Sequence, residues 1–227
     1  MLNHAKSINF VFEVNLLCLQ QNFDTQLLNF GQNAEKQSAG AEKFGYIESM
    51  RIYGNRQLRT VPGQKTRPTA ARVREALFDI WRDRIPGCSW LDLCAGNGSM
   101  GAEALCRGAS KVVGIEQYGK ACKVIEHNWQ QVATPQQTYE LLKGDVLVKI
   151  KKLTGQQFDW IYFDPPYDSY LYLPVLKTIA SLELVTKEGA IAVEHNPKLW
   201  QAKQIPGLEI YRTKSYGNTT LSFYAVQ

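Results

Sequence analysis

Residues 90–101 decide the fold and read Trp90-Leu91-Asp92-Leu93-Cys94-Ala95-Gly96-Asn97-Gly98-Ser99-Met100-Gly101. A short apolar run enters a glycine-rich turn, and residues 99–107 then have a helical pattern that Gly108 should stop. Glycines tolerate positive φ and let the backbone approach a ligand closely. The spacing also fits a dinucleotide-binding fingerprint, so the glycines alone do not decide between cofactor classes.

Acidic residues follow the next two predicted strands. Glu116 ends an apolar strand at 111–116, where a carboxylate can accept hydrogen bonds from ribose hydroxyls. Asp145 and Val146 follow a strand at 139–143, and the Asp145 carboxylate either accepts from an adenine amine or caps a helix over 146–152. Asp92 lies inside the first strand, where its charge would repel a pyrophosphate and suit a cationic sulfonium.

Asp164-Pro165-Pro166-Tyr167 follows a further apolar strand at 158–163. Two prolines hold the chain extended and donate no hydrogen bond. The Asp164 carboxylate and the Pro165 carbonyl could accept the two N–H bonds of a planar amine, while Tyr167 stacks on its ring. The alternative is a simple Asp-Pro turn with a surface tyrosine.

The order of these motifs resembles that of S-adenosylmethionine-dependent amino-group methyltransferases. From Met50 onward the chain resembles more specifically the bacterial small-subunit rRNA guanine-N2 methyltransferases, the RsmD family. Asn97 and Tyr53 are small departures from the family's pattern. The resemblance rests on these segments: Met50-Arg51-Ile52-Tyr53-Gly54, Thr66-Arg67-Pro68-Thr69, Arg72-Val73-Arg74-Glu75-Ala76-Leu77-Phe78, Val193-Glu194-His195 and Tyr216-Gly217-Asn218-Thr219.

This resemblance implies methyl transfer from S-adenosylmethionine to the exocyclic N2 of a guanine in 16S rRNA. The implied partner is small-subunit rRNA or its assembly particle. The implied catalytic residues are Asp164, Pro165, Pro166 and Tyr167, and the implied cofactor-binding residues are Asp92, Cys94, Ala95, Gly96, Gly98, Glu116, Asp145 and Val146.

Alternation of strands and helices predicts an α/β, Rossmann-like domain over residues 85–227, with a mostly parallel seven-stranded sheet. A Gly-Asn turn between 208–216 and 220–226 predicts a C-terminal hairpin that adds an antiparallel strand. Ligands of open α/β sheets bind at the carboxyl ends of the strands, where all the motifs above fall. We expect the other strands near 89–94, 111–116, 139–143, 158–164 and 190–195, and the helices near 99–107, 118–131 and 171–182.

Residues 50–84 are predicted to form a basic arm and a helix. Residues 51–74 contain seven basic residues and no acid, and glycines and prolines break the first half into a turn-rich arm or hairpin. Thr69–Arg84 has the pattern of an amphipathic helix. A solvated basic face is the alternative to RNA binding. The predicted RNA contacts are Arg51, Arg56, Arg59, Lys65, Thr66, Arg67 and Arg72.

The amino-acid composition indicates a globular protein but does not indicate its function. The chain has 227 residues, 44% of them apolar, and no apolar run approaches the ~20 residues of a membrane helix. Five cysteines without CxxC spacing and three histidines indicate neither a metal site nor a disulfide framework. We expect a cytoplasmic monomer.

Residues 1–49 are predicted to be a poorly structured extension, because residues 31–45 have linker composition. Phe10–Leu19 is apolar, but a single preceding lysine and the lack of a small-residue cleavage site make it a poor signal peptide. The plainest explanation of this extension is a start codon assigned too early, since the resemblance begins at Met50; a native extension is the alternative.

Two other functional classes stay open. A DNA adenine-N6 methyltransferase shares the motif order, although 227 residues leave little room for a target-recognition domain. A non-catalytic RNA-binding or assembly module with a vestigial cofactor pocket is the other, and the intact acids at the strand ends argue against it.

Overall fold

The computed structural model describes residues 49–61 and 68–227. Residues 1–48 of the predicted extension therefore lie outside the described residues. The same is true of three predicted RNA contacts, Lys65, Thr66 and Arg67.

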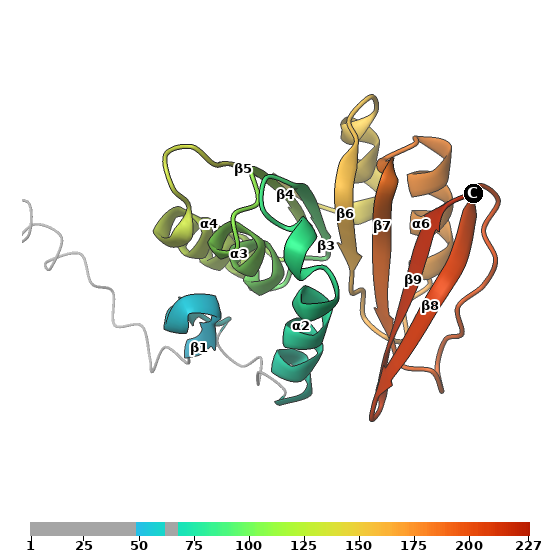
Figure 1. Ribbon diagram of the computed structural model, residues 1–227, viewed down its shortest axis with the longest axis horizontal. Helices are drawn as coiled ribbons and strands as arrows, with labels where there is room; N and C mark the ends of the chain where they lie inside the picture. Colours follow the sequence, from blue (N-terminus) through green and yellow to red (C-terminus); the bar gives the residue numbers. More distant parts are fainter. Residues whose placement is uncertain (1–48, 62–67) are drawn as a thin grey trace, which may run out of the picture. The chain divides into compact units, whose positions relative to one another are not determined.

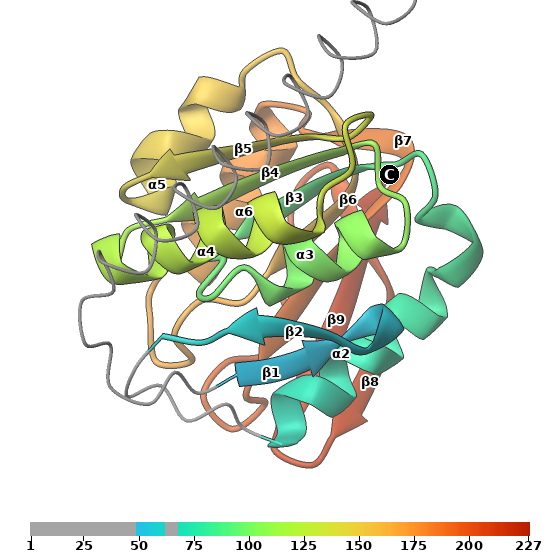
Figure 2. The same cartoon turned by 90° about the vertical axis from the view of Figure 1, so that its left-hand side faces the viewer.

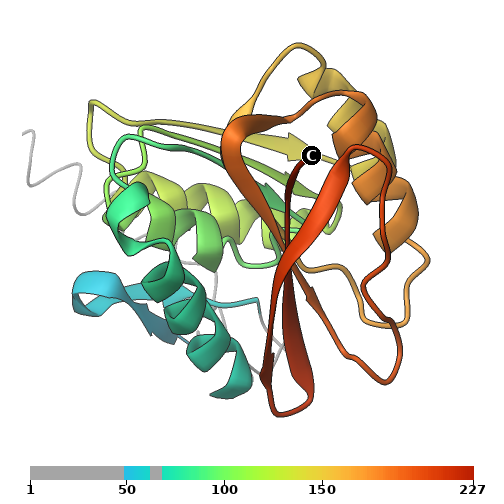
Figure 3. The same cartoon turned by 45° about the vertical axis from the view of Figure 1, so that its right-hand side comes forward.

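The centre of the fold is a seven-stranded sheet in the order β5-β4-β3-β6-β7-β9-β8 (Figure 1). Strands β3 to β7 are parallel, whereas β9 runs antiparallel to both of its neighbours (Figure 3). The prediction of a mostly parallel α/β sheet with a C-terminal antiparallel hairpin is therefore confirmed. The strands are β3 (Ser89–Leu93), β4 (Lys111–Glu116), β5 (Thr138–Lys143), β6 (Phe158–Phe163), β7 (Val185–His195), β8 (Leu208–Tyr216) and β9 (Thr219–Val226).

Helices cover both faces of the sheet, as Figure 2 shows. Side chains alternate along each strand, so that Trp90 packs on one face and Leu91 on the other. Helices α2 (Pro68–Ile80), α3 (Ser99–Cys106) and α4 (Gly119–Val132) pack on the Trp90 face. The Leu91 face is covered by α5 (Val146–Lys149), the 3-10 turn η3 (Ile150–Leu153) and α6 (Tyr172–Ser181).

Close packing of α3 against α4 depends on a glycine. A Cβ on Gly101 would lie 2.5 Å from Cζ2 of the buried Trp129. Only a residue without a side chain lets the indole lie against the start of α3. The glycines of this segment are thus required for the packing of α3 as well as for the turn before it.

The start of the described chain is an antiparallel hairpin of β1 (Ser49–Ile52) and β2 (Arg56–Arg59), joined by the 3-10 turn η1 (Tyr53–Asn55). Ile52 and Leu58 are buried in the same core cluster as Trp90. The predicted arm is therefore a hairpin that packs on the domain.

The amphipathic helix ends earlier than its sequence pattern predicts. It stops at Ile80, and Arg82–Arg84 form the separate 3-10 turn η2. Trp81 leaves the helical conformation, with φ −105° and ψ 10°, and its ring stacks on Trp160 at 4.4 Å between centroids. Burial of this indole against the sheet outweighs one more turn of helix.

Among the described residues, no helix combines the length and apolar character needed to cross a bilayer.

Candidate active site

A cleft of about 1480 Å³ opens at the carboxyl ends of the parallel strands. Segments far apart in the sequence meet there: the hairpin, α2, the glycine turn, the ends of β4, β5 and β6, and the start of β9. Predicted site residues that line it are Arg51, Asp92, Cys94, Ala95, Gly96, Glu116, Asp145, Val146, Asp164, Pro165, Pro166 and Tyr167.

The glycine turn joins β3 to α3 through left-handed backbone. Gly96 and Gly98 have φ of 59° and 73°, and Cys94 has φ of 63°. A cysteine in this conformation costs about 1–3 kcal/mol, a strain that tends to occur at functional sites. A Cβ on Gly96 would meet nothing within 4 Å, so its backbone faces open space in the cleft.

Glu116 connects this turn to the next strand. One carboxylate oxygen accepts the Gly96 N–H at 2.8 Å, and the other accepts the Tyr118 N–H at 2.7 Å. The residue is 9% exposed and lines the cleft. Its carboxylate is thus held in one orientation at the end of β4.

Asp92 lies deeper than the sequence suggests. It is 1% exposed, and its Oδ2 accepts the Gly101 N–H at 3.1 Å. Burial is the main cause that raises the pKa of Asp92 to about 7, opposed by the Gly101 hydrogen bond and assisted by the negative charge of Glu116. This carboxyl group is therefore only partly ionised at neutral pH. Its hydrogen bond to the Gly101 N–H stabilises the segment that follows the glycine turn.

Asp145 caps α5. Its Oδ1 accepts the Leu147 N–H at 2.8 Å and the Val148 N–H at 3.3 Å. The helix-cap alternative is therefore observed, while Asp145 also lines the cleft. Its contact with an adenine amine stays a prediction.

The Asp164–Tyr167 loop leaves β6 directly into the cleft. The Asp164 N–H donates to the Leu93 carbonyl at 3.4 Å, which ties the loop to β3. Asp164 and Tyr167 are partly exposed and Pro165 is buried. Their assignment to catalysis stays a prediction.

The Tyr167 hydroxyl is anchored, although its sequence suggested only an aromatic face. It donates to Glu194 Oε1 at 2.8 Å and lies 3.2 Å from the Thr219 hydroxyl. Tyr162 donates to the other oxygen of Glu194. Burial and the nearby Glu194 charge raise the pKa of Tyr167 above its usual range, so the phenol remains a donor. Only the resemblance of 193–195 and 216–219 to family segments pointed to these partners.

Three predicted RNA contacts are exposed on the hairpin, namely Arg51, Arg56 and Arg59, and Arg72 is exposed on α2. Arg56 also donates to the Val132 carbonyl of α4 at 3.2 Å. Of these four arginines, only Arg51 lines the cleft.

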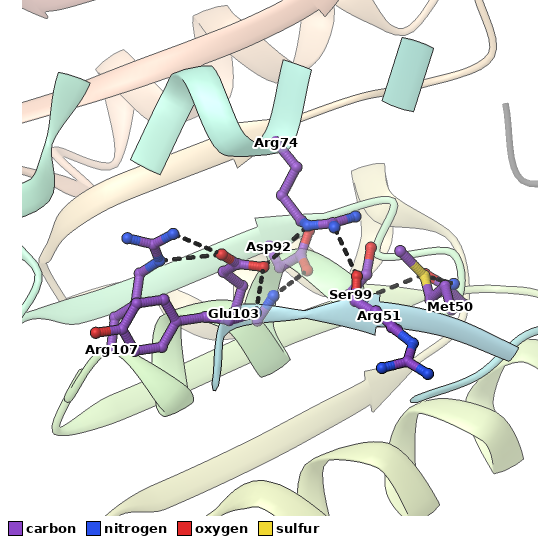
Figure 4. Close-up of polar contacts among 10 residues, drawn as sticks. Met50, Arg51, Arg74, Asp92, Ser99, Glu103 and Arg107 are labelled. Atoms are coloured by element: carbon purple, nitrogen blue, oxygen red, sulfur yellow. Dashed lines mark hydrogen bonds and ion pairs between the residues drawn. The ribbon is translucent and has the colours of Figure 1, made fainter. Parts of the chain in front are cut away.

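Arg74 belongs to the basic run of the sequence, yet it is only 3% exposed. Its Nε donates to Glu103 of α3 at 2.9 Å, and its Nη2 donates to the Arg51 carbonyl of β1 at 2.9 Å (Figure 4). Arg107 binds the other oxygen of Glu103 at 2.8 Å. The cluster ties α2, α3 and the hairpin together, and burial makes the loss of any one partner costly.

No group of three or more histidine, cysteine or acidic residues in the described ranges could hold a metal ion.

Comparison with known proteins assigns nearly all of residues 50–227 to one protein family. The sequence model described as "Conserved hypothetical protein 95" matches residues 50–225. The chain is 28% identical over 173 residues to "Putative rRNA methyltransferase YlbH" of Bacillus subtilis, covering 74% of this chain and 92% of that protein. It is 32% identical over 144 residues to "Ribosomal RNA small subunit methyltransferase D" of Haemophilus influenzae, covering 63% and 75%.

Among solved structures, the fold is similar to "Putative methyltransferase yhhF from Escherichia coli". The TM-score is 0.69 at 25% identity, and the match covers 79% of this chain and all 100% of that one.

Proposed function

This chain belongs to the conserved hypothetical protein 95 family, and from that premise we propose that it is an S-adenosylmethionine-dependent methyltransferase of small-subunit ribosomal RNA. We infer that the accepting atom is the exocyclic N2 of a guanine. The names of the Bacillus and Haemophilus relatives support an rRNA substrate.

One observation carries the proposal: the Asp164–Tyr167 loop and the glycine turn line the same cleft. Methyl transfer requires an acceptor nitrogen to lie in line with the bond that breaks at the donor. A loop suited to a planar amine, beside a turn suited to a nucleoside cofactor, meets that requirement.

The residues of the cleft fit this cofactor. Open space at Gly96 lets a ligand approach the backbone, and Glu116 presents a fixed carboxylate to ribose hydroxyls. Asp145 lines the cleft and would accept from an adenine amine. Asp92 is only partly ionised, so its charge separates a sulfonium from a pyrophosphate less strongly than its sequence position suggests. When bound, S-adenosylmethionine supplies an electrophilic methyl group on a sulfonium.

The Asp164 carboxylate and the Pro165 carbonyl act on the acceptor. The lone pair of the guanine amine is delocalised into the ring, which makes the nitrogen a poor nucleophile. Two hydrogen bonds accepted from its N–H groups would rotate the amine and direct its lone pair toward the methyl group. Asp164 can then hold the departing proton before water removes it.

Tyr167 would stack on the guanine, which must be unpaired or flipped out of a helix. Its hydrogen bond to Glu194 fixes the ring before the base arrives. The exposed arginines of the hairpin would contact phosphates, supplying affinity and registration without base choice.

The proposal is tested by methylation of small-subunit RNA from a strain that lacks the gene, both protein-free and as assembled particles. Labelled S-adenosylmethionine should yield N2-methylguanosine at one position, and Asp164→Ala should yield none. Label in adenine of duplex DNA would support the DNA methyltransferase class. Tight RNA binding without any transfer would support a non-catalytic module.

A further inference from the structure

The side chain of Asn128 joins the hairpin to the glycine turn. Asn128 lies on α4 and is fully buried. Its Oδ1 accepts the Arg59 N–H of β2 at 3.0 Å, and its Nδ2 donates to the Arg59 carbonyl at 3.0 Å. The same Nδ2 donates to the Asn97 carbonyl of the glycine turn at 3.0 Å. One amide group thus binds both segments.

A second contact joins the same two segments from the other strand of the hairpin. The Nδ2 of Asn97 lies 3.0 Å from the sulfur of Met50 on β1, and its Oδ1 accepts the Ser99 N–H at 3.2 Å. Asn97 is therefore held by β1 through its side chain and by Asn128 through its carbonyl. A shift of the hairpin would therefore either break these contacts or move the backbone between Gly96 and Gly98.

Among the described residues, Trp129, the residue after Asn128, binds the glycine turn but not the hairpin. Its Nε1 donates to the Gly98 carbonyl at 2.8 Å, so α4 already supports the turn. Within the described part of the chain, the Trp129 side chain makes no hydrogen bond to the hairpin. Asn128 precedes Trp129 on α4, and its side chain also binds the backbone of β2 at Arg59.

We propose that Asn128 is a positioning residue that couples RNA binding at the hairpin to cofactor binding at the glycine turn. This inference rests on the proposed function, which supplies the two ligands. RNA bound to the hairpin would stabilise it in its observed position and, through Asn128, stabilise the Asn97–Gly98 backbone in the cofactor-binding conformation. By thermodynamic linkage, the cofactor would then strengthen RNA binding by the same factor.

Gln131 provides a matched control. It lies one turn further along α4, and its Nε2 donates to the Gln57 carbonyl of β2 at 3.4 Å. Gln131 therefore joins the same helix to the same strand as Asn128 does, but it makes no hydrogen bond to the glycine turn among the described residues. Gln131→Ala should therefore loosen the hairpin slightly and leave the coupling unchanged.

The experiment measures the affinity for S-adenosylhomocysteine with and without the form of small-subunit RNA that the wild type methylates. RNA should strengthen this binding at least about fivefold in the wild type, the lower end of typical couplings. The factor should fall to about one in Asn128→Ala and stay at the wild-type value in Gln131→Ala. A purely structural role would lower the melting temperature of Asn128→Ala and leave the factor unchanged.

Equal affinities with and without RNA in the wild type, or full coupling in Asn128→Ala, would overturn the inference while leaving the proposed function intact. A wild type that does not bind S-adenosylhomocysteine contradicts both. If Asn128→Ala does not fold, Asn128→Ser keeps a small polar side chain that is too short to bridge Arg59 and Asn97. It should at least halve the coupling factor, and an unchanged factor would then overturn the inference.

Discussion

The Tyr167 hydroxyl donates a 2.8 Å hydrogen bond to Glu194, which lies on the neighbouring strand β7. The same hydroxyl lies 3.2 Å from Thr219 at the start of β9. The ring proposed to stack on the target base is therefore fixed by two strands that lie outside its own loop.

Tyr167→Phe should lower the transfer rate several-fold, and Tyr167→Ala should lower it much further. Stacking alone requires only the ring and would predict a mild effect for phenylalanine. The hydrogen bonds change that expectation, since phenylalanine leaves Glu194 without one donor at a largely buried position. Single-turnover kinetics measure the rate, and wild-type turnover in Tyr167→Phe would show that the anchor has no role in transfer.

Asp164→Ala should abolish transfer and change cofactor affinity by no more than a few-fold. The carboxylate is proposed to act on the acceptor amine, whereas the cofactor contacts lie at other strand ends. Calorimetry with S-adenosylhomocysteine and a methylation assay measure the two effects separately. Near-normal turnover would remove Asp164 from the proposed mechanism.

Glu116→Ala should weaken S-adenosylmethionine binding by roughly 1–3 kcal/mol, the usual loss for hydrogen bonds to a charged group. It should also lower stability, because the Gly96 and Tyr118 N–H groups lose their acceptor. NAD serves as the control ligand and should not bind. Micromolar NAD affinity would instead support a dinucleotide enzyme.

Asp92 should make stability depend on pH. In the unfolded chain this carboxyl ionises near pH 4, whereas burial raises its pKa to about 7 in the folded protein. Between these values the folded state binds more protons, so stability should fall as pH rises through this range and level off above about pH 7.

Asp92→Asn keeps an oxygen acceptor for the Gly101 N–H and removes the ionisation. The melting temperature of the variant relative to the wild type should therefore be higher at pH 8 than at pH 5. Asp83→Asn removes an exposed aspartate and serves as the control. An equal difference in melting temperature between Asp92→Asn and the wild type at both pH values would show that Asp92 does not titrate in this range.

Replacing the basic residues of the arm should flatten the salt dependence of RNA binding. Each neutralised phosphate contributes about 0.7 to 0.9 to the log–log slope, so four alanines should reduce its magnitude by about 3. The quadruple variant combines Arg51→Ala, Arg56→Ala, Arg59→Ala and Lys65→Ala. A control variant replaces four exposed lysines elsewhere, at Lys151, Lys152, Lys177 and Lys187. An unchanged slope in the first variant would identify the arm as a solvated basic face.

The sequence was sufficient to predict the sheet and the edge of the sheet at which the candidate site residues meet. Apolar runs bounded by glycine and proline gave strands such as Phe158–Phe163 with the bounds that the structure has. Acids placed at strand ends had to meet at one edge, because the strands are parallel. Glu116, Asp145 and Asp164 accordingly line one cleft.

The contacts between distant segments could not be predicted in this way. Arg74 follows Val73 in a basic run, and nothing local indicates that Glu103 of another helix will neutralise it. The pairing of Tyr167 with Glu194 depends on β6 and β7 being neighbours. Sequence periodicity describes the faces of single elements, whereas these pairs depend on how elements pack.

The position of β9 between β7 and β8 has a consequence for the order of events during synthesis. Thr219–Val226 leave the ribosome after the other described strands, yet they cover the edge of β7 and bring Thr219 to the Tyr167 hydroxyl. We expect a nascent chain that lacks this strand to expose an unpaired sheet edge and a loosely held base-binding loop. The proposed methyl transfer should therefore require Thr219–Val226 to have left the ribosome and paired with β7.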